Sequence, residues 1–319
     1  MRALAALLLL LTTHPALAET VADWRREFPK TDFSRAVIDL DEIASDGAVR
    51  DSIPPVGTPR FRPAVEIKDV GELEPVLSIG IKGDFRAYPL RLLLWHEIVN
   101  DVVGGRPLLI SYCPLCNSGV VFDRRLADGQ VLEFGNTGRL RHFDMVMYDK
   151  ATESWWQQFE GRAIIGGLAG TLLKPLPARL ESLAKFRERA PRGMVLVPEN
   201  PSARAYGTTP YVRMDTGRPN PDRFPFPLPK GVGALDRVVV VGDQAWTLKA
   251  LSTKTRITAG NLVLTWQAGQ NSIHDAKWIA FGRDVGNVVV QRAGADVPYD
   301  VTFAFAFAAF RPEGKLHQD

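Results

Sequence analysis

The chain has 319 residues, with 39 basic and 36 acidic side chains that nearly cancel to a net charge of +3. This length is ample for a buried core, organised as one large domain or two small ones. The basic residues are scattered in short groups, which excludes a nucleic-acid-binding surface of the usual kind.

The N-terminus has the pattern of a secretion signal. Arg2 is followed by an apolar run over residues 3–11, and Ala16-Leu17-Ala18 fits the small-x-small rule of signal peptidase. The apolar run is too short to span a bilayer. We therefore expect residues 1–18 to be a cleaved signal peptide and the mature chain to start at Glu19. The mature protein is expected to be soluble, in the periplasm or outside the cell, with no membrane span.

The segment from residue 61 to residue 218 is predicted to be rich in strands, after an irregular lead-in over residues 19–60. Pro89 is predicted to open a helix, because the N–H that proline lacks has no partner at that position anyway. Strands are predicted, in chain order, at residues 76–81, 85–88, 107–112, 120–122, 131–134 and 144–148, and a second helix at residues 178–190.

Residues 219–230 are dense in proline and predict a linker or an extended surface loop. The remaining segment, residues 231–319, returns to strand patterns. Within it, Phe303, Phe305 and Phe307 alternate with alanines, which is typical of a strand with one bulky face.

A weak internal repeat relates the two parts of the chain. Residues 77–90 align with residues 238–248, and residues 106–118 align with residues 260–272. The fold expected from these patterns is α+β and β-rich, with the repeat indicating two related β-rich halves and a few short helices. The alignment also places residues 267–270 in a turn equivalent to residues 113–116.

Four motifs carry a resemblance to a known family. They are, in chain order, RAYPLRLLLWHEIVND, YCPLCNSGVVFDR, MYDKATESWW and FAFAAFRPE. Together they resemble a bacterial domain of unknown function that is catalogued as number 3179. The resemblance covers most of the mature chain and implies a shared fold and a shared Cys-Pro-Leu-Cys site. It implies no reaction, because the family has no established activity.

The chemistry of this sequence centres on its two cysteines, Cys113 and Cys116. In thioredoxin-type sites such a pair opens a helix. Here Asn117-Ser118-Gly119 and a strand pattern follow, which favours a hairpin turn of the kind that aims two sulfurs at one metal ion. A disulfide across so short a loop would stabilise the fold little.

Three hypotheses follow from this pair. The leading one is a protein that binds copper or zinc through Cys113 and Cys116, with His, Met, Asp or a partner's residues as the other ligands. The second is a thiol–disulfide oxidoreductase that uses the same pair. The third is a binding module in which the pair forms a structural disulfide.

Four further residues are candidate ligands. Met145 and Met147 share one face of a predicted strand, and their thioethers with thiolates would suit Cu(I), although methionines also fill cores. His142 precedes that strand and points to its other face. His96 lies far along the predicted helix, where a strand running back past it would bring Cys113 closer to the helix start, so a half-buried structural histidine is the favoured interpretation.

Other catalytic patterns are missing from the sequence. The glycine-rich residues 166–170 lack the Lys-Ser/Thr ending of a phosphate loop, so no nucleotide cofactor is indicated. There is no nucleophilic-serine elbow, and the carboxylates form no recognisable catalytic pair. The sequence therefore leaves open whether the protein is an enzyme.

Overall fold

The computed structural model describes residues 19–45, 47–216 and 224–319. The predicted signal peptide lies outside these residues, as do residues 219–223 of the predicted Pro-rich linker or loop. The remainder of that segment, residues 224–230, contains no helix or strand.

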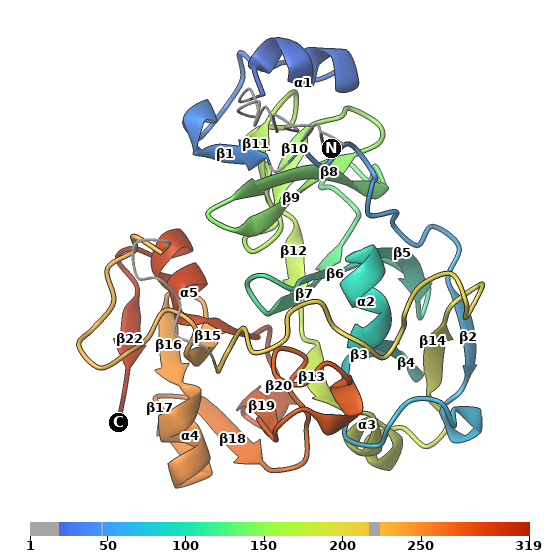
Figure 1. Cartoon of the computed structure of the whole chain (residues 1–319), viewed down its shortest axis with the longest axis vertical. Coiled ribbons are helices and arrows are strands. Elements are labelled where there is room, and N and C mark those ends of the chain that lie inside the picture. Colours follow the sequence, from blue (N-terminus) through green and yellow to red (C-terminus); the bar gives the residue numbers. More distant parts are fainter. Residues whose placement is uncertain (1–18, 46, 217–223) are drawn as a thin grey trace, which may run out of the picture.

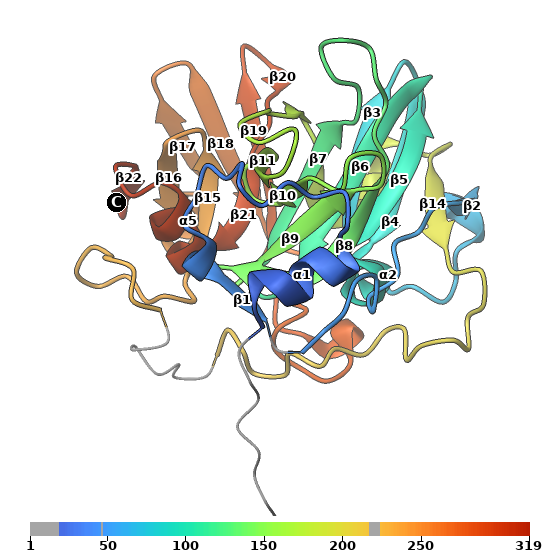
Figure 2. The ribbon, with the colours of Figure 1, turned by 90° about the horizontal axis from the view of Figure 1, so that it is seen from above.

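The described strands form five sheets, arranged as the blades of a five-bladed β-propeller (Figure 1, Figure 2). Blade 1 contains β1 (Ile43–Ser45), β8 (Phe134–Arg141), β9 (Asp144–Asp149), β10 (Trp155–Gln157) and β11 (Arg162–Ile165). Blade 2 contains β12 (Lys174–Leu176), β7 (Ser118–Asp123), β6 (Arg106–Cys113) and β5 (Ile98–Val103). Blade 3 contains β13 (Arg179–Ser182), β3 (Pro75–Ile81), β4 (Asp84–Pro89), β14 (Met194–Val197) and β2 (Arg60–Pro63).

The other two blades are built from the later part of the chain. Blade 4 contains β21 (Asp300–Phe303), β15 (Arg237–Val241), β16 (Gln244–Thr247) and β22 (Lys315–His317). Blade 5 contains β17 (Arg256–Ala259), β18 (Leu262–Gln267), β19 (Asn287–Arg292) and β20 (Ala295–Asp296). The helices are α1 (Val21–Glu27), α2 (Leu90–His96), α3 (Leu183–Arg189), α4 (Leu248–Lys254) and α5 (Ala304–Phe310), with short 3₁₀ turns at η1 (Leu40–Glu42), η2 (Ala64–Glu66) and η4 (Ile279–Phe281).

The expectation of an α+β fold made of two related halves is wrong. The helices α1 to α5 have seven residues each, too short to form a layer against a sheet, and only 15% of the structure is helical. Local periodicity identifies strands singly. How strands group into blades depends on pairing between distant segments, which no local pattern records.

Four of the blades nevertheless match in pairs by strand order. The order β13-β3-β4-β14 in blade 3 corresponds to β21-β15-β16-β22 in blade 4, and the last pairing is parallel in both. Likewise β12-β7-β6-β5 corresponds to β20-β19-β18-β17. The equivalence expected between two turns fails, however. Residues 114–117 connect β6 to β7 directly, whereas residues 268–286 separate β18 from β19.

Some predicted elements are also corrected. From Ala304 onward the alternating Phe/Ala segment is α5 rather than a strand, and only Phe303 belongs to a strand, β21. The three phenylalanines of α5 and two of its four alanines are buried, so the alternation in size does not reflect an exposed and a buried face. The helix predicted at residues 178–190 begins only at Leu183, after β13, where Ser182 accepts a hydrogen bond from the Lys185 N–H as its N-cap. The strand predicted at residues 131–134 begins only at Phe134. The strands predicted at residues 76–81, 85–88, 107–112, 120–122 and 144–148, and the helix after Pro89, are confirmed.

The apolar cores join both sides of the Pro-rich segment. One buried cluster contains Leu77 together with Val239, and a second contains Leu109 together with Phe303. The second cluster includes both cysteines. Within the described residues, no helix is long and apolar enough to cross a membrane.

Candidate metal centre

The Cys-Pro-Leu-Cys segment forms a tight hairpin turn, as predicted. Cys113 ends β6 and pairs with Ser118, the first residue of β7. The turn closes through a hydrogen bond from the Asn117 N–H to the Pro114 carbonyl oxygen (3.2 Å), and Asn117 adopts a left-handed φ of 54°. No helix follows the second cysteine, so the geometry of a thioredoxin site is absent here.

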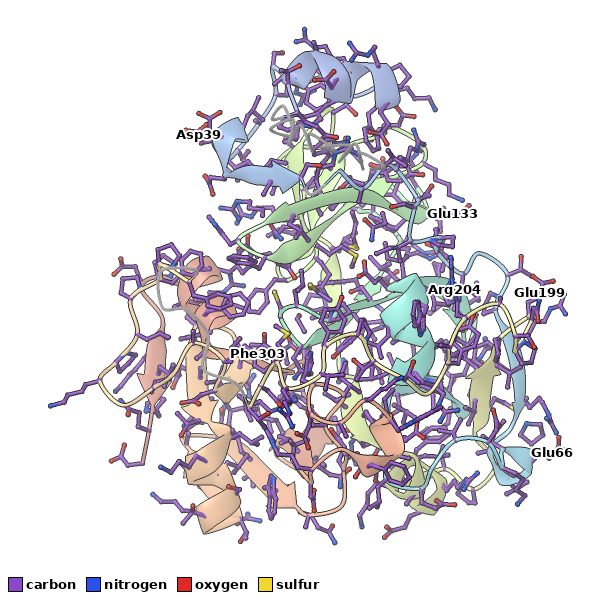
Figure 3. The ribbon with its side chains drawn as sticks, viewed as in Figure 1. Asp39, Glu66, Glu133, Glu199, Arg204 and Phe303 are labelled. Carbon is purple, nitrogen blue, oxygen red and sulfur yellow. The ribbon has the colours of Figure 1, made fainter. Side chains whose placement is uncertain are left out.

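Blade 4 holds this turn from the side. The Cys116 carbonyl oxygen accepts hydrogen bonds from the Phe303 N–H (2.9 Å) and the Thr302 hydroxyl (2.7 Å). The Ser118 hydroxyl donates to Asp300 Oδ2 (2.5 Å), and Asn117 Nδ2 donates to a carbonyl oxygen of β21 (2.6 Å). Figure 3 labels Phe303 near the middle of the molecule, where this contact lies. The turn therefore has a fixed backbone before any ligand binds.

A buried histidine holds the other side of the turn. His274 Nε2 lies 2.7 Å from the Pro114 carbonyl oxygen, and Nδ1 lies 3.3 Å from an Nη atom of Arg237. Burial, followed by the positive charge of Arg237, lowers the pKa of His274 to about 3. The ring is therefore neutral, and Nε2 is the nitrogen that donates, to Pro114.

The turn between β8 and β9 faces the cysteines from blade 1. It consists of His142 and Phe143, whose φ angles of 51° and 64° are both left-handed. Two-residue turns of this geometry normally use Asn-Gly, so a His-Phe turn is strained. Its carbonyl at Phe143 accepts from both thiols, with distances of 3.7 Å from Cys113 Sγ and 3.4 Å from Cys116 Sγ.

Asp144, the first residue of β9, completes the cluster. One of its carboxylate oxygens and the two cysteine sulfurs lie within 4.8 Å of one another, the single such group of three His, Cys, Asp or Glu residues in the described part of the chain. Oδ2 accepts from Gln157 Nε2 (2.6 Å) and from the Phe159 N–H (2.9 Å). Oδ1 is buried and accepts no well-aligned hydrogen bond. The two thiols nevertheless lie close to the carboxyl group and lower its pKa, against the larger effect of burial.

Burial raises the pKa of four acidic groups at this cluster. It raises the pKa of Asp144 to about 7, and it raises the pKa of both thiols above their usual range. Glu97, at the end of α2, is also enclosed, and burial raises its pKa to about 8. Its carboxylate accepts from Asn136 Nδ2 (2.5 Å). A metal-free cluster therefore holds several protons at neutral pH.

The other predicted ligands lie in different surroundings. Met145 and Met147 are buried in the same apolar cluster as the cysteines, and Met145 Sδ lies 3.4 Å from Asn136 Nδ2. His142 Nε2 lies 2.9 Å from a Glu42 oxygen. His96 contacts the Pro54 carbonyl oxygen and the Tyr206 hydroxyl, each at 2.9 Å. Neither histidine belongs to the cluster around the cysteines.

Sequence reasoning missed Asp144 and Glu97 as parts of the site. The sequence predicts Asp144 only as part of a strand. The signal that could identify it is a carboxylate at each end of a fully buried strand, at Asp144 and Asp149, since a charged group in such a position needs a partner.

Fold and site together define a five-bladed β-propeller with a buried dithiol–carboxylate cluster between blades 1 and 2. The family model described as Protein of unknown function (DUF3179) matches residues 50–314, a range that contains the whole cluster, and the chain belongs to this family. No curated protein and no solved structure matches the chain.

Proposed function

We propose that this protein binds a transition-metal ion through Cys113 Sγ, Cys116 Sγ and the Asp144 carboxylate. The observation that carries the proposal is a buried carboxylate oxygen, Asp144 Oδ1, whose only neighbours able to bind it, among the described residues, are the two buried thiols beside it. Enclosing ionised acids is costly unless a cation compensates them. A metal ion would displace the protons that these groups otherwise hold, and it would satisfy Asp144 Oδ1.

The donor set favours zinc over copper. Zinc accepts thiolate and carboxylate oxygen together in a tetrahedral site, at about 2.3 Å to sulfur and about 2.1 Å to oxygen. The ligand atoms, within 4.8 Å of one another, need only a small movement to reach such a geometry. Cu(I) prefers soft ligands alone, and the carboxylate is a hard one. The Phe143 carbonyl or a water molecule would take the fourth position.

The burial of the thiols argues against thiol–disulfide exchange as the function. Cys113 is 1% exposed and Cys116 is fully enclosed. An exchange site needs an accessible thiolate with a lowered pKa, whereas burial raises the pKa of both thiols here. The N-terminal pattern supports a location in the periplasm or outside the cell, where free neighbouring thiols tend to oxidise. A bound metal would keep this pair reduced in such a compartment.

Metal content and a cobalt spectrum test the proposal. Protein stripped with chelator and re-equilibrated with Zn²⁺ should hold about one ion per chain, and Co²⁺ should give a sulfur-to-metal charge-transfer band. The C113S/C116S variant should lose both signals. D144N should bind zinc at least about tenfold more weakly, because one charged ligand becomes neutral.

The matched control is D149N. Asp149 is a buried aspartate at the other end of β9, where it accepts hydrogen bonds from Thr152 and Trp156. This variant should bind zinc like the unmodified protein. Absence of zinc from the unmodified protein, or full zinc content in C113S/C116S, contradicts the proposal.

A further inference from the structure

Two loops, residues 205–215 and residues 273–283, pair along one face of the molecule. Their tip is the segment from Trp278 to Phe281. Thr208 in the first loop forms an antiparallel β-bridge with Trp278 in the second loop. The Thr209 N–H donates to the Lys277 carbonyl oxygen (3.0 Å), and the Arg213 N–H donates to the Asp275 carbonyl oxygen (2.9 Å). The two loops lie together at the lower edge of Figure 2. They therefore form one surface, called here the paired-loop face.

Large apolar side chains project from this face. Trp278 is 53% exposed, Phe281 is 77% exposed and Val212 is 46% exposed. In the described part of the chain, no other tryptophan or phenylalanine is among the exposed large hydrophobic residues. Trp278 and Phe281 are three residues apart at the 3₁₀ turn η4, a spacing that puts side chains on the same side of such a turn.

The backbone of this tip is already paired. The Ile279 N–H donates to the Gly207 carbonyl oxygen (3.0 Å), and the Phe281 N–H donates to the Trp278 carbonyl oxygen (2.9 Å). Asn271 Nδ2 donates to the carbonyl oxygens of Ile279 (3.1 Å) and Ala280 (2.9 Å). These groups can therefore leave water without losing hydrogen bonds, which is the main requirement for entering a membrane interface.

The charges around the tip are basic. Arg213 and Lys277 are exposed, and within the described residues neither makes an ion pair. Arg204, labelled in Figure 3, is a further exposed cation directly before the first of the two loops. Two carboxylates lie three residues from the tip: that of Asp275 accepts from the Arg283 N–H (2.7 Å), and that of Asp284 accepts from the N–H groups of Gly269 (2.8 Å) and Gln270 (3.0 Å). The surface is thus complementary to an anionic one.

We propose that the paired-loop face docks on an anionic lipid bilayer. Trp278 and Phe281 enter the headgroup region, where amphipathic and aromatic side chains are favoured, while Arg213 and Lys277 contact lipid phosphates. A bilayer fits better than a folded partner because Trp278 and Phe281 are 53% and 77% exposed rather than set in a groove of their own chain. A protein partner would need a pocket to receive each of them, whereas lipids rearrange around them. The inference does not depend on metal binding.

Co-sedimentation with vesicles tests this inference on the full mature chain. The protein should bind vesicles of phosphatidylcholine mixed with phosphatidylglycerol and be released by high salt. The double variants W278A/F281A and R213Q/K277Q should each weaken binding, the second by about fivefold for each charge removed. The matched control is L172A, which removes an apolar side chain that is 58% exposed outside both loops.

Three outcomes overturn the inference. The first is absence of binding to the anionic vesicles, and the second is binding by W278A/F281A equal to that of L172A. The third is capture by an acidic polypeptide such as polyglutamate without capture by vesicles, which would identify the face as a protein-docking surface. Circular dichroism of each variant checks that the protein is still folded after the substitutions in the loops.

Discussion

Replacing Glu97 with glutamine should flatten the dependence of stability on pH in the metal-free protein. Burial raises the pKa of Glu97 from 4.5 to about 8, so the folded state keeps a proton that the unfolded state releases. The stabilisation is complete below the unfolded pKa and is lost as pH rises through about 8. Each extra proton held by the folded state lowers the unfolding free energy by about 1.4 kcal/mol per pH unit.

Between about pH 5.5 and 7.5, titration of Glu97 should lower the unfolding free energy of the unmodified protein by roughly 2–3 kcal/mol, and that of E97Q should not change for this reason. Glutamine keeps an oxygen that can accept from Asn136 Nδ2, so the variant should still fold. Urea unfolding of chelator-treated protein at a series of pH values measures the difference. E133Q removes a carboxylate at an exposed ion pair with Lys150 and serves as the control. Parallel curves for E97Q and the unmodified protein would refute a buried, protonated Glu97.

Two further predictions concern the cysteine turn. The C113S/C116S variant should melt within about 5 °C of the unmodified metal-free protein, because the two cysteines are free in the structure and a serine hydroxyl can donate to the Phe143 carbonyl in place of each thiol. A much larger drop by calorimetry would indicate a structural disulfide. H274A should lower the unfolding free energy by about 2–4 kcal/mol, because it removes the donor to the Pro114 carbonyl and leaves a cavity. H274Q, whose side-chain amide can replace the Nε2 donor, should recover part of this loss in urea unfolding, and equal losses in the two variants would exclude a role for that hydrogen bond.

The parts of the site that could be predicted are local in sequence. Asn117, Ser118 and Gly119 are turn formers followed by a strand pattern, and this was enough to predict the hairpin that carries both cysteines. Asp144, the third residue of the proposed metal site, could not be predicted in the same way. Asp144 reaches the sulfurs only because blade 1 packs against blade 2, through contacts between β5 and β8 that no local pattern records.

The same limit explains the error in fold class. The sequence predicts the same order of strand, turn and strand in residues 77–90 and residues 238–248. The structure has this order in both segments, each followed by a helix. Yet β13 and β14 of blade 3 come from about a hundred residues after β3 and β4. Four strands of blade 1, β8 to β11, lie between β7 and β12 in the chain, and its fifth strand, β1, comes near the N-terminus. Closure into a propeller depends on these long-range pairings. The error at α5 has a local cause, because five of its seven residues are buried and its alternating Phe and Ala residues imitate the period of a strand.

The support of the cysteine turn by β21 has a consequence for how the protein is made. The hydrogen bonds from Ser118 to Asp300 and from Thr302 to Cys116 span 182 and 186 positions of the chain. A chain that has emerged only through blades 1 to 3 has both sulfurs and Asp144, but lacks the strand that fixes the turn. The cluster therefore reaches its final geometry only after nearly the whole polypeptide has been synthesised. Under the proposed function, a partly emerged chain would hold the three ligand groups without the support that fixes their positions.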